Sequence, residues 1–375
     1  MRIQGPWIRP VLRLGVVLAA CIGGGSGTGG ATAAGPPISP GPGSVGGLFS
    51  RAVAPASTTT PVPTAANAPA RVTNRPAAYP TGLTPGNLEV GGVTRQFRVY
   101  TPTGLTGSPK ALVLVLHGGG GVGLGIANPG AHPLSVFRDV ADREGFIVVY
   151  PGGLPAQDGA PGWNDCRSDN QVSSGADDVA FLNALIEALR AEFDLPASRV
   201  FMAGGSNGAQ MTLAYALAGP GNVAAIAVSN GNLPLNPKSG ACSAPARRRL
   251  PVLMAHGTAD PAMPYAGGCV ANLGGGCARG RVIGAEATRD AWIAANGLSV
   301  VSPVQTIVDP NTTDPGPANR FVYPGAVPME WWRLDGGGHP VASQTILVAT
   351  TARAGPQNRD VEFAEIAWSF FKSRL

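Results

Sequence analysis

Short apolar runs alternate with amphipathic stretches over most of the chain beyond residue 89. Seven runs are rich in apolar and β-branched residues and are predicted as strands: 96–100, 111–116, 145–150, 199–203, 223–228, 251–255 and 330–334. Four stretches show the spacing of amphipathic helices: 177–193, 207–217, 285–295 and 360–372. Near-continuous apolar strands that alternate with helices predict a doubly wound, mostly parallel α/β sheet with helices on both faces.

A further pair of strands is expected before this alternation begins. Residues 83–100 read as an antiparallel hairpin that turns at Gly91-Gly92, because two glycines supply the positive φ angles of a tight turn. We expect this hairpin to extend one edge of the sheet.

The net charge of +5 belongs to the first part of the chain. The first acidic residue is Glu89, and residues 89–375 hold 21 Lys and Arg against 22 Asp and Glu. A domain with no basic excess has no electrostatic footprint for nucleic acid, so we expect no nucleic-acid partner.

The N-terminus has the pattern of an export signal. Arg2, Arg9 and Arg13 precede the apolar run 14–20, which is too short to span a bilayer, and Cys21 follows. Residues 18–21 resemble a bacterial lipoprotein signal, which predicts a signal peptide over 1–20 and lipidation of Cys21 as the first mature residue. That lipid would be the only membrane attachment. The alternative is cleavage after residues 31–33, which gives a soluble secreted protein.

Residues 21–78 are dominated by Gly, Pro, Ala, Ser and Thr and contain no acid. Such a segment cannot bury enough apolar surface to offset the entropy of ordering. We expect a disordered tether there, followed by one catalytic domain over 79–375.

Four cysteines remain if Cys21 is lipidated: Cys166, Cys242, Cys269 and Cys277. Export and an even count favour disulfides, and four cysteines allow three pairings. Cys269–Cys277 is favoured because it closes a short glycine-rich loop, which leaves Cys166–Cys242. A zinc site is the alternative, but the chain has no C-x-x-C pair and only four histidines, so we expect no metal.

One motif carries candidate chemistry. The predicted strand 199–203 runs into Gly204-Gly205-Ser206-Asn207-Gly208, a G-x-S-x-G pattern followed by an apolar helix. A serine on so sharp a turn requires small residues at both outer positions, because a Cβ there would collide with the adjacent helix and strand. The pattern predicts Ser206 as a nucleophile.

A serine nucleophile needs a base, and the four histidines allow a choice by elimination. His339 follows the last predicted strand, at the carboxyl edge where sites of open α/β sheets lie. Asp260 follows the strand 251–255, so the order Ser206, Asp260, His339 is nucleophile, acid, base. Asp335 is the rival acid, whereas Asp177 and Asp178 are expected to begin a helix.

The tetrahedral intermediate needs hydrogen-bond donors for its oxyanion. The backbone N–H of Asn207 is one candidate, because it follows the nucleophile. The glycine run after His117 supplies the other, either Gly119 or Gly120, and the sequence does not choose between them. His117 and His256 are expected to be structural.

Six segments resemble the polyhydroxybutyrate depolymerase and feruloyl esterase group of α/β-hydrolases. They are LVLVLHGGGG (112–121), GWNDC (162–166), DDVAFL (177–182), AGGSNGAQM (203–211), HGTADPAMPY (256–265) and DGGGHP (335–340). The resemblance implies the α/β-hydrolase fold and serine carboxylesterase activity, with Ser206, Asp260 and His339 on the triad positions and no metal or cofactor. It also places Cys166 where the group often has a disulfide cysteine.

The chain departs from that group near the expected site. The loop 267–281 is longer than is typical, and Val341 and Ala342 stand where many relatives have a tryptophan. We expect an exported esterase acting on hydroxyalkanoate esters. The alternatives are a feruloyl or acetyl-xylan-type esterase and a non-catalytic binding protein on a hydrolase scaffold.

Overall fold

The structure is a computed structural model that describes residues 71–72, 79–120, 123–243, 249–270, 276–300 and 303–375. The chain divides into two units, 1–61 and 62–375, and every described residue lies in the second unit. The expected signal peptide, Cys21 and nearly all of the tether therefore lie outside the described residues.

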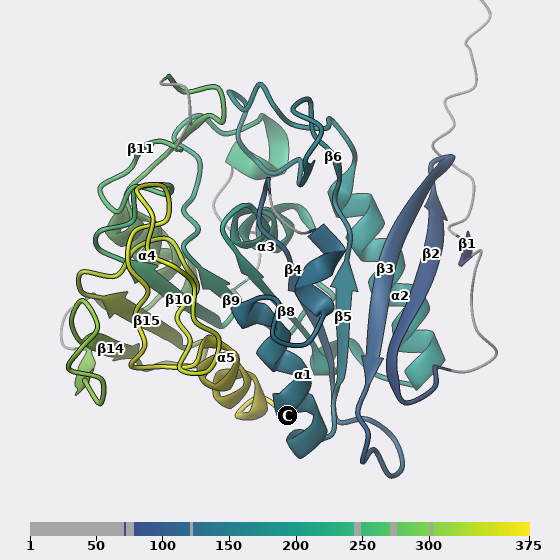
Figure 1. Ribbon diagram of the computed structural model, residues 1–375. Helices are drawn as coiled ribbons and strands as arrows, with labels where there is room; N and C mark the ends of the chain where they lie inside the picture. Colours follow the sequence, from purple (N-terminus) through teal and green to yellow (C-terminus); the bar gives the residue numbers. More distant parts are fainter. Residues whose placement is uncertain (1–70, 73–78, 121–122, 244–248, 271–275, 301–302) are drawn as a thin grey trace, which may run out of the picture. The chain divides into compact units, whose positions relative to one another are not determined.

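A single large sheet organises this unit (Figure 1). Its strand order is β1-β2-β3-β5-β4-β8-β9-β10-β15-β14-β13. The central strands run parallel: β5 (Ile147–Pro151), β4 (Leu112–Leu116), β8 (Val200–Gly205), β9 (Ala225–Ser229), β10 (Val252–Gly257) and β15 (Met329–Leu334). Antiparallel strands flank them: β1 (Arg71–Val72), β2 (Gly82–Val90) and β3 (Val93–Thr101) on one side, β14 (Ala318–Tyr323) and β13 (Val304–Val308) on the other.

Helices cover both faces of the sheet (Figure 1). One face packs against α1 (Phe137–Glu144) and α5 (Phe363–Lys372), and the other against α2 (Asp178–Phe193), α3 (Asn207–Ala218) and α4 (Ala285–Asn296). Successive strand residues point to opposite faces, so Leu112 and Leu114 join one core and Val113 and Val115 the other. Two cores explain why these strands are apolar at every position.

Short elements lie in the connections. They are β6 (Leu154–Pro155), β7 (Pro161–Gly162), β11 (Gly268–Cys269), β12 (Arg281–Val282) and the 3₁₀ turns Gly123–Ala127, Pro133–Val136, Ala197–Arg199 and Gly240–Ser243. None of the helices within the described ranges combines the length and apolarity needed to cross a bilayer.

The predicted fold class is confirmed, and so is the edge hairpin. β2 and β3 pair through Val90 and Val93, with Gly91 and Gly92 at φ 58° and 76° as a two-residue turn requires.

Three longer elements were not predicted from the sequence: α1, β13 and β14. The two-residue strands β1, β6, β7, β11 and β12 were not predicted either. α1 is only eight residues long, and β13 is largely exposed at the sheet edge, so neither carries a long apolar run. One boundary also differs, because β1 pairs with Leu88 and Glu89 although residues 71–72 fall inside the expected tether.

Both expected disulfides are present. Cys166 is joined to Cys242 with Cα atoms 5.4 Å apart, and Cys269 to Cys277 with Cα atoms 5.0 Å apart. The first ties the loop before α2 to the segment after β9, and the second closes the loop after β11.

Candidate active site

Ser206 occupies the turn between β8 and α3 in a backbone conformation that side chains rarely adopt, with φ 56° and ψ −123°. A Cβ on Gly204 would lie 2.5 Å from the backbone carbonyl carbon of Gly208. A Cβ on Gly208 would lie 2.5 Å from the carbonyl oxygen of His117 and closer still to that of Leu116. The two outer glycines are therefore required by contact with helix and strand backbone, as the motif predicts.

The structure brings the three predicted residues together. His339 Nε2 lies 2.8 Å from Ser206 Oγ, and His339 Nδ1 lies 2.8 Å from Asp260 Oδ2. These side chains come from loops that follow β8, β10 and β15, whose carboxyl ends share one edge of the sheet. The hydrogen-bonded chain runs from acid to base to nucleophile.

Asp260 is held as a hydrogen-bond acceptor on both oxygens. Its side chain is fully buried, and Oδ1 accepts the backbone N–H groups of Ala262 and Met263, each at 2.8 Å. With Oδ1 engaged, Oδ2 is left to face His339. This arrangement fixes the orientation of the imidazole.

Asn230, a buried residue that the sequence analysis overlooked, holds the histidine loop. It follows β9 with φ 53°, a conformation that asparagine tolerates. Its amide donates to the His339 carbonyl at 2.7 Å and its Oδ1 accepts the Gly257 N–H at 3.0 Å. The side chain thus connects the end of β10 with the loop after β15. The available signal was its position: Asn230 is a polar residue just after the predicted strand 223–228.

The glycine run after β4 lies against the nucleophile. A Cβ on Gly118 would be 3.3 Å from the Ser206 Cβ, and one on Gly119 would be 3.3 Å from the Asn207 Cβ. The Gly120 N–H donates to the Pro161 carbonyl at 3.2 Å, whereas no acceptor among the described residues receives the N–H of Gly119. Of the two candidate glycines, Gly119 is therefore the one whose N–H has no acceptor among the described residues.

His117 and His256 are buried, and burial lowers the pKa of each, so both are neutral near pH 7. His117 Nε2 accepts the Gly153 N–H at 2.9 Å, and its Nδ1 donates to the Gly118 carbonyl at 2.8 Å. His256 Nε2 donates to the Met263 carbonyl at 2.9 Å. These bonds support the loops under the site, which is the structural role expected of both residues.

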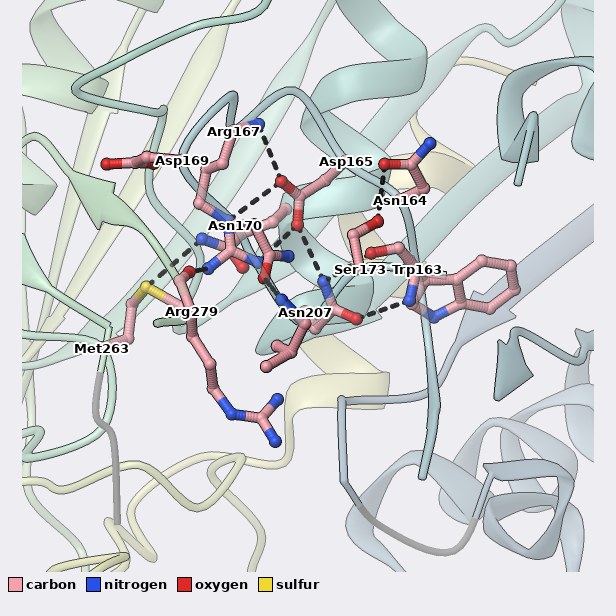
Figure 2. A network of polar contacts seen from close by, with 12 residues as sticks. Trp163, Asn164, Asp165, Arg167, Asp169, Asn170, Ser173, Asn207, Met263 and Arg279 are labelled. Atoms are coloured by element: carbon pink, nitrogen blue, oxygen red, sulfur yellow. Dashed lines mark hydrogen bonds and ion pairs between the residues drawn. The ribbon is translucent and has the colours of Figure 1, made fainter. Parts of the chain in front are cut away.

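Asn207 contributes its side chain as well as its backbone (Figure 2). Its Oδ1 accepts the Trp163 N–H at 2.7 Å, and its Nδ2 donates to Asp165 at 2.8 Å. Asp165 in turn forms two hydrogen bonds with the guanidinium of Arg167, at 2.9 and 2.6 Å, and both side chains are buried. The first turn of α3 is therefore fixed to the loop that carries Cys166. Neither Asp165 nor Arg167 was predicted from the sequence to have a role.

A cavity of about 660 Å³ opens above Ser206. Ser206, His339, Asn207 and Gly119 line it, and Trp163 forms part of its wall although that side chain is nearly fully buried. The indole N–H of Trp163 donates to the His117 carbonyl at 2.8 Å, so the ring also supports the glycine run.

The remaining acids of interest lie elsewhere in the structure. Asp335, the rival acid, pairs with Arg333 at 2.7 Å and accepts from Asn319 at 3.0 Å. Asp177 caps α2 by accepting the Ala180 N–H, and the buried Asp178 pairs with Arg95 at 2.5 Å. These are the local and helix-start roles expected of them.

Three carboxylates outside the cavity, Asp309, Asp314 and Asp360, offer oxygens within 4.8 Å of one another. Asp314 and Asp360 use their oxygens to accept backbone N–H groups of the surrounding loops. This cluster takes no part in the site around Ser206.

Residues 105–272 match the model of the phospholipase/carboxylesterase family of α/β-hydrolases. The chain is 28% identical over 176 residues to a bifunctional acetylxylan esterase/xylanase of Neocallimastix patriciarum, and 33% identical over 113 residues to feruloyl esterase B of Neurospora crassa. These alignments cover 46% and 30% of this chain. The chain spans only 22% of the length of the first relative and 36% of the length of the second.

Among solved structures, an acetyl xylan esterase from Aspergillus awamori aligns over 72% of this chain and 94% of its own, with 18% identity and a TM-score of 0.47. Independently of that likeness, the central strand order and the sharp strand-to-helix turn at Ser206 are those of the α/β-hydrolase fold. Together with the match over residues 105–272, these observations show the α/β-hydrolase fold.

Proposed function

We propose that the protein is a serine carboxylic ester hydrolase with Ser206, His339 and Asp260 as its catalytic triad. One observation carries the proposal: the hydrogen-bonded chain from Asp260 through His339 to Ser206 Oγ ends at the floor of a cavity. The family match and the esterase relatives support the same chemistry.

Acylation follows from the geometry. His339 Nε2 accepts the Ser206 proton as Oγ attacks the ester carbonyl, because the two atoms are already within hydrogen-bond distance. The tetrahedral intermediate places its negative oxygen near the backbone N–H groups of Asn207 and Gly119. His339 then donates its proton to the leaving alcohol oxygen, the ester C–O bond breaks, and an acyl-Ser206 ester remains.

Deacylation uses the same groups in reverse. Water attacks the acyl-enzyme carbonyl while His339 accepts one of its protons. Collapse of the second tetrahedral intermediate returns the proton to Ser206 Oγ and releases the free acid. Each oxyanion donor contributes on the order of 10²–10³ in kcat in serine hydrolases.

For the substrate we propose hydroxyalkanoate esters and their oligomers, hydrolysed by an exported protein that is attached to the envelope through Cys21. The motifs shared with the polyhydroxybutyrate depolymerase group support this choice. The alternative is a feruloyl or acetyl-xylan-type esterase, which the named activities of the two curated relatives favour. The two disulfides favour an oxidising compartment in either case.

The full chain should be assayed on a 3-hydroxybutyrate trimer, methyl ferulate and acetylated xylo-oligosaccharide, with Ser206→Ala as the matched blank. We expect the trimer to have the highest kcat/KM, and we expect Ser206→Ala to lose at least about a thousandfold in kcat. A higher kcat/KM for either of the other esters would replace the hydroxyalkanoate assignment. Full activity in Ser206→Ala, or no labelling of the wild type by a fluorophosphonate probe, would overturn the triad.

A further inference from the structure

The lining of the cavity above Ser206 has more positive than negative side chains. Arg167, Arg279 and Arg353 line it, whereas Asp158 is the one acidic residue among its described lining. Arg167 is neutralised by the buried Asp165, and Arg279 pairs with the half-exposed Asp158. Arg353 is left as the excess positive charge.

No carboxylate pairs with Arg353 in the described part of the chain. The segments outside that part contain no Asp or Glu, so they supply no acidic partner either. Arg353 is exposed and lines the same cavity as Ser206 and His339.

The backbone beside Arg353 is fixed to the catalytic loop. Its neighbour Ala354 accepts the His339 N–H, and the turn closes through the Gly355 N–H to the Thr351 carbonyl at 2.7 Å. The backbone of Arg353 is therefore held close to His339, the proposed base. The Arg353 side chain itself has no acidic partner among the described residues.

Arg279 presents a second cation on the glycine side of the cavity. Its guanidinium nitrogens lie 3.6 and 3.7 Å from where a Cβ of Gly119 or Gly120 would stand. Its carbonyl accepts from Arg167, which holds its backbone, and only its Nη2 is engaged by an acid. A guanidinium has five N–H donors, so a substrate oxygen can bind beside Asp158.

We propose that these two arginines form an anion subsite that binds a free carboxylate on the ester substrate, with Arg353 as the principal contact. The preferred substrates would then be esters that carry a second, ionised carboxyl group, as the chain end of a hydroxyacid oligomer does. Guanidinium groups bind carboxylates through paired, charge-assisted hydrogen bonds. This inference rests on the proposed esterase function and deepens it toward short, acid-ended substrates.

The test compares a 3-hydroxybutyrate trimer with its C-terminal carboxamide on the full chain. Both molecules have the same two ester bonds, and only the charge at the end differs. We expect kcat/KM to be roughly fivefold higher for the free acid, a modest ratio because Arg353 is solvent-exposed. The preference should appear in KM and shrink as salt is raised.

Three variants localise the effect through the acid-to-amide ratio, which cancels any loss of folded enzyme. Arg353→Gln should remove most of the preference. The double variant Arg279→Gln/Asp158→Asn should also lower the acid-to-amide ratio relative to the wild type. Replacing both partners of the pair avoids leaving Asp158 unpaired. Arg199→Gln is the matched control, because this exposed arginine precedes β8 at the opposite edge of the sheet, and its ratio should equal that of the wild type.

The outcomes separate the two proposals. Equal cleavage of acid and amide by the wild type would overturn the anion subsite and leave the esterase proposal standing. An unchanged ratio in Arg353→Gln would overturn the assignment to Arg353. If neither trimer is cleaved above the Ser206→Ala blank, the hydroxyalkanoate function is wrong and the subsite inference falls with it.

Discussion

At the scale of the residue, the site depends on a few positions with strict steric requirements. Ser206 is held at positive φ, and a Cβ added to Gly204 or Gly208, the outer glycines of the motif, would lie about 2.5 Å from backbone atoms. Because the contacts are with backbone carbonyls rather than flexible side chains, the neighbours have no simple way to move.

We predict that Gly208→Ala strongly destabilises the fold. The new methyl group would meet the carbonyl oxygens at the end of β4, so the free energy of unfolding should fall by about 3 kcal/mol or more. Urea denaturation followed by tryptophan fluorescence measures the change.

Gly104→Ala is the matched control for that substitution. No atom lies within 4 Å of its added Cβ, so its stability should stay within about 0.5 kcal/mol of the wild type. Equal stability of the two variants would show that the turn at Ser206 does not need a glycine at position 208.

At the scale of the element, loops rather than strands connect the parts of the site. The loop before α2 reaches α3 through Asn207, and reaches the segment beyond the Cys269–Cys277 loop through the bond from Arg167 to the Arg279 carbonyl. The ion pair between Asp165 and Arg167 lies at the centre of these contacts, with side chains only 1% and 4% exposed.

We predict that Asp165→Ala costs about 3–5 kcal/mol in the free energy of unfolding, because it leaves the Arg167 guanidinium buried without its partner. Glu365→Ala removes one partner of the exposed pair with Arg143, whose side chains are 45% and 54% exposed, and should cost at most about 1 kcal/mol. Thermal and urea unfolding of the two variants provide the comparison. Similar losses in both would mean that burial of the Asp165 pair is not what matters.

At the scale of the whole molecule, the histidines link stability to pH. Burial lowers the pKa of His117, His132 and His256, and that of His132 falls to about 4. In the unfolded chain each of these groups titrates near pH 6.5, so the unfolded state binds more protons as the solution is acidified. The stability that these neutral side chains confer is therefore complete above pH 6.5 and is lost as the pH falls toward the folded pKa.

His132→Asn tests this dependence. His132 accepts the Leu134 N–H as a helix cap, and asparagine can make the same bond without titrating. Between pH 7 and pH 5 we expect the free energy of unfolding of the wild type to fall by up to about 2 kcal/mol more than that of the variant. Denaturation curves at the two pH values measure this difference. Parallel pH profiles for both proteins would contradict the prediction.

The local sequence alone determined much of the molecule. Apolar runs and helical spacing depend on near neighbours in the chain, so the central strands, the edge hairpin and four of the helices could be predicted from pattern. The G-x-S-x-G turn is equally local, because its steric requirement is set by the adjoining strand and helix. The order of Ser206, Asp260 and His339 then followed from where each lies after a strand.

Only the tertiary structure decided the rest. The sequence could not tell the backbone N–H groups of Gly119 and Gly120 apart, because they differ through a hydrogen bond from Gly120 to the distant Pro161. It gave no role to Asn230, since that side chain acts on a loop that is 109 residues away. Arg279 and Arg353 share a cavity only because the strand order brings their loops to one edge of the sheet. Local patterns specify elements, but contacts between distant loops exist only once the sheet has assembled.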